Sequence, residues 1–251
     1  MAMTAGNSSR LPAGLLRYGA DVGAFARERL KWNPDEKQMM VLRTRARRVL
    51  LNCSRQWGKT TVAATKVLHV ALMRRRRTIL VISENMSQTS EFFQKIDEFL
   101  ERLGIKAKRE AGKTLARRLP NGSRIIGIAA REAAVRGYTA DFVFIDEAAR
   151  IKDEVIDALS PVIAVRRGDV WIASTPRGKR GRFWEAWAYG AGEDLLKVSA
   201  PASENPRIDP ELVERCRQEK GEDYVKREFG CEFVENGVEM MSLEDVDSIV
   251  F

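Results

Sequence analysis

The sequence has few of the residues that build metal sites and disulfide frameworks, and it has no long apolar run. It contains three cysteines and one histidine in 251 residues. An odd number of cysteines fits neither a disulfide framework nor a zinc pattern, so we expect reduced thiols. The lone His69 cannot build a metal site, and we expect it on a helix face. No apolar segment approaches the roughly 18 residues that span a bilayer, and residues 1–14 lack the charged-then-apolar order of a signal peptide. The composition therefore argues against disulfide-stapled, zinc-bound and membrane-embedded proteins.

Basic residues, in contrast, are abundant and clustered. The 43 lysines and arginines outnumber the 35 acidic residues and give a net charge of +8. Basic patches attract polyanions through phosphate contacts that release counterions. A solvated surface explains any one cluster, but six clusters together favour a nucleic-acid partner. The clusters are Arg43, Arg45, Arg47 and Arg48; residues 74–77; Lys106, Lys108 and Arg109; Arg117 and Arg118; Arg166 and Arg167; and Lys179, Arg180 and Arg182.

The hydrophobic pattern predicts strands that alternate with helices. Short apolar runs indicate buried strands, and apolar residues at helical spacing indicate amphipathic helices. The expected strands cover residues 49–52, 78–83, 141–146 and 169–174, with shorter strands on either side of the turn at 120–122. The expected helices cover residues 59–73, 87–103, 152–159 and 180–189. This alternation predicts an α/β fold, a parallel sheet with helices on both faces.

The pattern changes near residue 200, where three prolines interrupt a loop and two helical stretches then run to Phe229. We interpret residues 1–29 as an N-terminal tail and helix and residues 30–199 as the α/β core. Residues 200–235 are expected to form a small helical lid subdomain, and residues 236–251 a linker stub.

A phosphate-binding loop is predicted at residues 53–60, between the first expected strand and the first helix. The general pattern is glycine, four residues, then Gly-Lys-Ser/Thr. Here Cys53 replaces the first glycine, whereas Gly58, Lys59 and Thr60 are intact. Backbone N–H groups of such a loop hold phosphate oxygens, while Lys59 would contact the β- and γ-phosphates and Thr60 would bind Mg²⁺. Gly-Lys-Thr also occurs by chance, so the loop alone does not decide the function.

Two adjacent carboxylates, Asp146 and Glu147, follow the expected strand at residues 141–146. The end of a buried parallel strand lies at the same sheet edge as a phosphate-binding loop. There Asp146 would hold Mg²⁺, and Glu147 would orient or deprotonate the attacking water. The competing interpretation is an exposed acidic turn, and the predicted phosphate-binding loop upstream makes it the less favoured one.

Two further segments are compatible with the same site. Ser174 and Thr175 end the strand at residues 169–174 and would point toward the γ-phosphate, although a plain turn at Pro176 explains them too. Gln38 carries the donor and the acceptor that an adenine edge requires. A helix that starts near Pro34 accounts for it equally well.

Together these segments resemble the ATPase domain of the large terminase subunits of tailed bacteriophages. The resemblance is carried by residues 51–61, 146–149 and 174–178, and it covers about residues 30–235. It implies a P-loop core, ATP and Mg²⁺ as cofactors, and hydrolysis that packages double-stranded DNA into a procapsid in the host cytoplasm. The implied partners are DNA, a homo-oligomeric ring on a portal and a small terminase subunit, with no membrane.

The resemblance also implies roles for individual residues. Gln38 would contact adenine, Arg55 would lie near the γ-phosphate, and Ser174 with Thr175 would couple hydrolysis to movement. The expected nucleotide-binding residues are Gln38, Ser54, Arg55, Gln56, Trp57, Gly58, Lys59, Thr60 and Thr61. Thr60 and Asp146 would bind the metal, and Glu147, Arg55 and Arg136 would be catalytic.

Arg136 is expected in a polar loop over residues 131–139. It precedes the acidic strand and would therefore lie far from its own nucleotide unless the loop doubles back. The resemblance suggests that Arg136 enters the site of a neighbouring subunit, with Arg131, Arg150 and Arg177 as competing candidates. The alternative interpretation is a surface arginine at a turn.

Two other functions share features with this sequence. A superfamily 2 helicase-like translocase would need a second motor domain, and a non-catalytic DNA-binding scaffold would not need the intact Lys59, Thr60, Asp146 and Glu147. Large terminases usually continue into a nuclease domain, whereas about sixteen residues follow Glu235. We therefore expect no nuclease activity in this chain, which would be a piece of a longer protein or one whose nuclease is separate.

Overall fold

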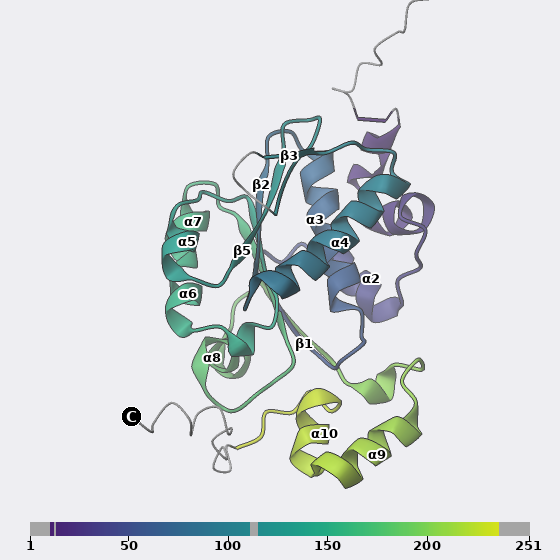
Figure 1. Cartoon of the computed structure of the whole chain (residues 1–251), viewed down its shortest axis with the longest axis vertical. Helices are drawn as coiled ribbons and strands as arrows, with labels where there is room; N and C mark the ends of the chain where they lie inside the picture. Colours follow the sequence, from purple (N-terminus) through teal and green to yellow (C-terminus); the bar gives the residue numbers. More distant parts are fainter. Residues whose placement is uncertain (1–10, 13, 111–114, 236–251) are drawn as a thin grey trace, which may run out of the picture.

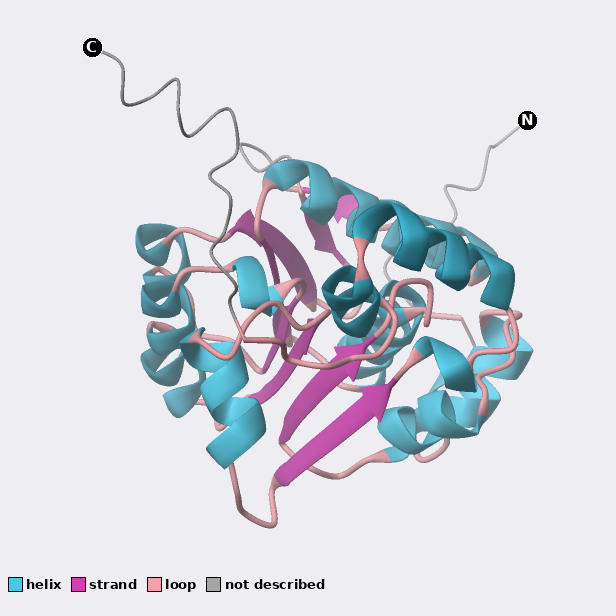
Figure 2. Ribbon diagram, turned by 90° about the horizontal axis from the view of Figure 1, so that it is seen from below, coloured by secondary structure: helices cyan, strands magenta, loops and turns pink. Residues whose placement is uncertain are grey.

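The computed structural model describes residues 11–12, 14–110 and 115–235. In this part of the chain an eight-stranded sheet lies between two layers of helices (Figures 1 and 2). The strands are β1 Arg48–Cys53, β2 Thr78–Ser83, β3 Lys108–Arg109, β4 Ala116–Arg118, β5 Arg124–Ala129, β6 Phe142–Ile145, β7 Asp169–Ser174 and β8 Leu195–Ala200. Their order in the sheet is β3-β4-β5-β2-β6-β7-β1-β8. The predicted α/β fold class is confirmed.

Six neighbouring strands, in the order β5-β2-β6-β7-β1-β8, are parallel to one another. At the β5 edge, β4 pairs antiparallel with β5, and β3 pairs antiparallel with β4. The register pairs Asn52 with Ser174 and Ile82 with Ile145, so the carboxyl ends of β1, β7, β2 and β6 lie along one edge of the sheet. The amino ends of the same strands lie along the opposite edge. Residues that follow the strands and residues that precede them are thereby gathered into two separate regions.

Helices cover both faces of the sheet (Figure 1). On one face lie α2 Glu36–Arg43, α3 Lys59–Met73 and α4 Met86–Arg102, with the N-terminal elements η1 Leu15–Gly19, α1 Val22–Ala24 and η2 Phe25–Arg29. On the other lie α5 Glu132–Arg136, α6 Asp153–Asp157, α7 Leu159–Ala164 and α8 Gly181–Tyr189. The predicted position of His69 on a helix face is confirmed, because it lies on α3 and its Nε2 is 2.9 Å from the Tyr18 carbonyl oxygen. No helix in the described ranges has the length and hydropathy needed to cross a membrane.

The hydrophobic core is divided by the sheet, because alternate residues of each central strand face opposite layers. In β2, Ile79 and Val81 pack on the α3 side, while Leu80 and Ile82 pack on the α7 side, and all four are buried. Burying such side chains stabilises the fold by about 1.5–3 kcal/mol each. Burial on both faces also explains why the strands are uninterrupted apolar runs.

The segment after β8 forms η4 Ala202–Glu204, α9 Pro210–Lys220 and α10 Glu222–Glu228, which lie below one end of the sheet in Figure 1. It has a small hydrophobic cluster of its own, made by Ala202, Ile208, Val225 and Phe229. The two predicted helices of this region are confirmed, and treating it as a lid subdomain stays an interpretation. The predicted linker stub at residues 236–251 and most of the predicted N-terminal tail lie outside the described residues.

The structure differs from the sequence-based prediction in three places. The loop expected over residues 131–139 is wrong in part, because α5 occupies Glu132–Arg136. The single helix expected over 152–159 is two short helices, α6 and α7, which meet at Ala158. Strand β8 was not predicted. Its Leu195, Leu196 and Lys197 are only partly buried at the sheet edge, so its apolar signal is weak.

Candidate nucleotide-binding site

The predicted phosphate-binding loop connects β1 to α3 at the carboxyl edge of the sheet. Two of its residues have left-handed backbone conformations, Gln56 at φ +61° and Gly58 at φ +97°. Gly58 is the N-cap of α3, and no side chain caps this helix end. The first N–H groups of a helix have no partner within the helix. The N–H groups of Lys59, Thr60 and Thr61 therefore present the positive end of the helix dipole to an anion.

Lys59 and Glu147 form an ion pair across the site. The Lys59 Nζ donates to Glu147 Oε1 at 2.7 Å, and the two side chains are 11% and 23% exposed. Glu147 follows β6 with a left-handed backbone at φ +51°, a conformation that a non-glycine residue adopts rarely and mostly at functional sites. Its neighbour Asp146 accepts the Glu147 N–H at 3.1 Å. The structure thus brings together the lysine and the two carboxylates that the sequence analysis assigned to one site.

The charges in this group shift one another's pKa values. Burial alone would lower the pKa of Lys59, but Glu147 and Asp146 outweigh it and raise that pKa. Burial likewise opposes ionisation of Glu147, yet Lys59 holds the pKa of Glu147 below its ordinary value. Burial raises the pKa of Asp146 to about 6, with Lys59 acting in the opposite direction and Glu147 in the same one. At neutral pH the site holds one lysine cation facing carboxylate charge.

The end of β7 contacts this group through hydroxyl groups. The Thr175 Oγ1 donates to Glu147 Oε2 at 3.4 Å. The buried Ser174 hydroxyl donates to the Thr175 carbonyl oxygen at 2.7 Å and accepts the Ala149 N–H at 3.1 Å. Ser174 and Thr175 are therefore tied to the segment that carries Glu147. That they couple hydrolysis to movement stays a prediction.

The segment after β8 contacts the loop directly, which the sequence did not indicate. Arg55 pairs with Glu228 of α10, and its N–H donates to the Glu228 carbonyl oxygen at 3.1 Å. The Asn205 side-chain amide donates to the Gln56 carbonyl oxygen at 3.3 Å. The Glu228 side chain is 10% exposed, and its hydrogen bond and charge together raise the pKa of Arg55. Glu228 and Asn205 lie about 150 residues or more from the loop in sequence, so no local pattern could have identified them.

Gln38 has its amide engaged within the chain. Its side-chain oxygen accepts the Asp35 N–H at 3.0 Å, and its Nε2 donates to the Trp57 carbonyl oxygen at 2.7 Å. The first bond belongs to a capping box that starts α2, and the second holds the phosphate-binding loop. Gln38 is 2% exposed, so in this conformation its buried side chain supports the loop through the hydrogen bond to Trp57. Contact with adenine stays a prediction.

Other predicted loop residues divide into backbone and side-chain roles. The Trp57 indole is 3% exposed and packs in the core, so Trp57 meets the site through its backbone. Ser54 is buried, and its N–H donates to the Ala200 carbonyl oxygen at 3.0 Å. Its hydroxyl has no hydrogen-bond partner among the described residues. Thr61 accepts the Thr65 hydroxyl at 2.8 Å through its carbonyl oxygen.

The donor set fits a hydrated Mg²⁺, which proteins hold through one or two carboxylates together with substrate phosphates. The ligands predicted for it are Thr60, in the first turn of α3, and Asp146. At the end of β2, which pairs with β6, the Ser83 hydroxyl is buried and has no hydrogen-bond partner in the part of the chain that the structure describes. In the described ranges, this site included, no group of three or more His, Cys, Asp or Glu residues is placed to hold a metal ion without other ligands.

Arg136 lies apart from this group of residues. It is exposed at the end of α5 and lines a hollow of about 590 Å³ with Glu154, Asp157, Ala158 and Pro161 of α6 and α7. None of the residues predicted to bind phosphate lines this hollow. A role for Arg136 in the site of a second subunit stays a prediction.

Comparison with models of protein families matches residues 50–246 to the family described as terminase large subunit, T4likevirus-type, N-terminal. The chain belongs to this family. The match begins within β1 and includes the loop, Lys59, Asp146, Glu147, Ser174 and Thr175, whereas Gln38 lies outside it.

Individual large terminases are similar over most of the chain. The terminase large subunit of Escherichia phage T5 is 29% identical over 224 residues, 84% of this chain and 50% of the relative. That of Thermus phage G20c is 26% identical over 86% of this chain and 52% of the relative. The chain therefore spans about half the length of these curated relatives.

Solved structures of large terminases share the fold. The large terminase ATPase domain of Thermus phage P74-26 is 26% identical, with a TM-score of 0.73 over 83% of this chain and 97% of that one. The large terminase of a thermophilic bacteriophage, solved in complex with ADP, has a TM-score of 0.67 at 16% identity. The similarity covers 80% of this chain and 54% of that one. The chain thus has the P-loop NTPase fold of large terminase ATPase domains.

Proposed function

We propose that this chain binds ATP with Mg²⁺ at the carboxyl edge of the sheet and hydrolyses it, as the ATPase unit of a motor that packages double-stranded viral DNA. The observation that carries the proposal is the Lys59–Glu147 ion pair of 2.7 Å, beside Asp146. One phosphate-binding lysine, one metal-binding carboxylate and one carboxylate that positions water are the groups that phosphoryl transfer to water requires. The similarity to large terminase ATPase domains supports the same assignment.

The ion pair indicates how the site would respond to a nucleotide. In the structure Lys59 forms an ion pair with Glu147, so the Glu147 carboxylate is not available to accept a proton from water. Phosphate oxygens at the start of α3 would draw Lys59 away, and Glu147 would become available to accept a proton from water. Thr175 keeps the Glu147 side chain oriented through its hydroxyl. Mg²⁺, when bound by Thr60 and Asp146, would neutralise charge on the phosphate oxygens.

The remaining roles follow from the family resemblance and belong to the same proposal. Arg55, now paired with Glu228, would sense the γ-phosphate, and Gln38 would contact adenine after rearrangement. Arg136 would act on the nucleotide of a neighbouring subunit in a ring that assembles on a portal and works with a small terminase subunit. Work by such a ring would take place in the host cytoplasm, where procapsids are filled.

The test is phosphate release from ATP by the purified chain, measured with and without double-stranded DNA. We expect Mg²⁺-dependent release that Lys59→Ala abolishes together with tight ATP binding, because Lys59 contacts the ground-state phosphates. Lys106→Ala, an exposed lysine shortly before β3, serves as a control for the loss of one lysine. Release that persists in Lys59→Ala would refute the assignment of the site.

A further inference from the structure

A second region rich in chemistry-bearing residues lies at the opposite edge of the sheet from the nucleotide site. A hollow of about 800 Å³ opens there, between the amino ends of the parallel strands and the end of α3. Arg77 and Asp141 directly precede β2 and β6, and Arg166 and Arg167 shortly precede β7. Because the strands are parallel, these positions converge although they are far apart in the sequence.

The hollow carries a large excess of positive charge. Seven of the residues that line it are arginine or lysine, and three are aspartate. Like charges held close together repel one another and raise the free energy of the empty site. An anion that enters the hollow would relieve this repulsion.

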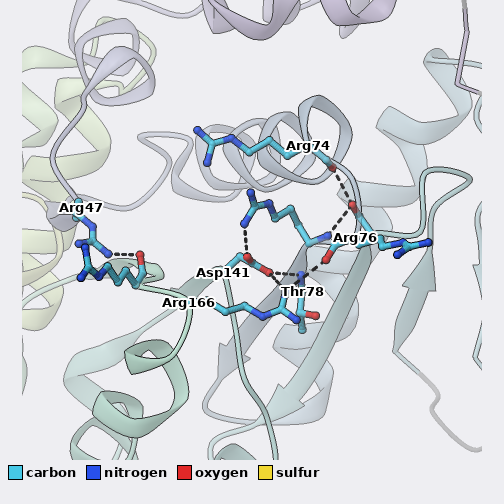
Figure 3. Close-up of polar contacts among 9 residues, drawn as sticks. Arg47, Arg74, Arg76, Thr78, Asp141 and Arg166 are labelled. Carbon is cyan, nitrogen blue, oxygen red and sulfur yellow. Dashed lines mark hydrogen bonds and ion pairs between the residues drawn. The ribbon is translucent and has the colours of Figure 1, made fainter.

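Part of the positive charge is neutralised inside the chain. Asp141, whose side chain is 4% exposed, accepts from Arg77 at 2.5 Å, from Arg166 at 2.8 Å and from the Thr78 N–H at 2.8 Å. Figure 3 shows Asp141 between Arg166 and the start of β2. These contacts fix the floor of the hollow.

Three arginines at the hollow are left without such partners. Among the described residues, the side chains of Arg45, Arg74 and Arg167 form no ion pair or hydrogen bond, and all three are exposed. In Figure 3 the guanidinium group of Arg74 extends away from the contacts around Asp141. Guanidinium groups bind phosphate oxygens through paired N–H donors.

We propose, resting on the function proposed above, that this arginine hollow is where the chain holds the phosphate backbone of double-stranded DNA, with Arg45, Arg74 and Arg167 as the phosphate contacts. A nucleic-acid backbone fits better than a single small anion because the basic surface continues beyond the hollow. Arg75 and Arg76 follow Arg74 and are exposed, and Arg76 extends away from the other residues in Figure 3. Repeating phosphates can use arginines spread over such a surface, whereas one phosphate cannot.

The site is separate from the nucleotide site. Helix α3 has 15 residues, with Lys59 at its first position, and Arg74 directly follows it. At 1.5 Å per residue, the two ends lie about 22 Å apart. One helix therefore has the phosphate-binding loop at its start and the arginine hollow at its end. ATP and DNA should bind without competing.

The test compares two variants that each lose three positive charges. The first is Arg45→Gln, Arg74→Gln and Arg167→Gln together, and none of these side chains has a hydrogen bond or ion pair to another described residue. The control is Lys106→Gln, Lys108→Gln and Arg109→Gln, three exposed residues on the strand β3 and just before it. Binding of a short blunt DNA duplex is measured across a salt series, with and without saturating ATP-γ-S.

Each phosphate contact contributes about 0.9 to the slope of log affinity against log salt. Losing three contacts should therefore reduce the magnitude of the slope by about 2.7 and weaken binding by about tenfold or more at moderate salt. The control should change the slope less, and ATP-γ-S should not displace the duplex from the wild-type chain.

The proposal is overturned if the hollow variant changes the slope no more than the control does. It is also overturned if the hollow variant loses binding of polyglutamate while DNA binding is unchanged, because the occupant would then be an acidic protein segment. A wild-type chain that binds no DNA would overturn both this assignment and the DNA part of the proposed function. Phosphate release without DNA should be the same in the hollow variant and the wild type, which separates the two proposals.

Discussion

Glu147→Gln tests the central contact of the nucleotide site, because it keeps the shape of the side chain and removes its charge. In the structure Glu147 accepts from Lys59 at 2.7 Å and from Thr175 at 3.4 Å. At this separation and an effective dielectric constant of about 20, the attraction between the two charges is about 6 kcal/mol. Most of it is offset by the cost of removing both groups from water. We expect a net loss of about 1–3 kcal/mol in the free energy of unfolding without nucleotide.

The same ion pair predicts that Glu147→Gln binds ATP more tightly than the wild type, although it hydrolyses ATP more slowly. ATP must displace Glu147 from Lys59, so removal of the Glu147 charge should make binding tighter, by up to about tenfold or 1.4 kcal/mol. Hydrolysis should fall about 10²- to 10⁴-fold, because the group that accepts the proton from water is lost. This fall corresponds to about 3–5 kcal/mol in the barrier.

Three measurements are needed on each protein: ATP-γ-S affinity, phosphate release in single turnover, and the denaturant midpoint without nucleotide. Glu101→Gln is the matched control, an exposed glutamate of α4 whose loss should leave all three unchanged. Turnover of Glu147→Gln at the wild-type rate would show that Glu147 is not the carboxylate that acts on water. Markedly weaker ATP-γ-S binding would show that Lys59 does not exchange Glu147 for phosphate.

Two other predictions concern an arginine and an aspartate outside this pair. Arg136→Ala and Glu147→Gln should each be inactive alone, and a mixture should regain ATPase activity because some interfaces join an intact Arg136 to an intact Glu147. Full activity of Arg136→Ala, or no recovery on mixing where wild type assembles, would exclude Arg136. Asp141→Asn should lower the free energy of unfolding at pH 7 by about 2–3 kcal/mol. Burial opposes ionisation of Asp141, but Thr78, Arg77 and Arg166 outweigh it and lower its pKa. The stabilisation is therefore present above the unfolded pKa of about 3.9 and is lost as pH falls through the lower folded value. Chemical denaturation at several pH values should show the difference between wild type and variant shrinking at acid pH, and a constant difference would contradict this.

The sequence predicted the elements whose signal is local. The position of the loop between β1 and α3, the bounds of α3 at Lys59–Met73, and those of β2 at Thr78–Ser83 were predicted as the structure has them. Each is a continuous segment with its own periodicity, and the central strands are apolar throughout because both of their faces are buried. Helix α5 was missed because a segment of five residues is too short to show a helical period in the sequence.

Part of the site could also be predicted, because a parallel sheet obeys a simple rule. Residues that follow buried parallel strands meet at one edge, so Asp146, Glu147 and Thr175 were assigned to the loop's side of the sheet from their positions alone. The sequence could not show which charges pair. The Lys59–Glu147 contact depends on the strand order, in which β7 lies between β1 and β6. The role of Gln38 beneath the loop likewise depends on how α2 packs.

Other features were decided only by the tertiary structure. Glu228 reaches Arg55 because the chain returns to the loop through β8 and α10, a contact between residues 173 positions apart. The sequence could not rank the six basic clusters, because a run of arginines looks the same in sequence wherever it lies on the protein surface. The fold joins parts of three of them at the amino edge of the sheet, where Asp141 pairs with Arg77 and Arg166. Arg45, Arg74 and Arg167 form no ion pair with another residue that the structure describes. Local patterns thus determined which segments form strands, helices and the loop between β1 and α3, because those signals arise between near neighbours. The order and register of the strands, which bring distant charges within a few ångströms, come from packing of the whole chain.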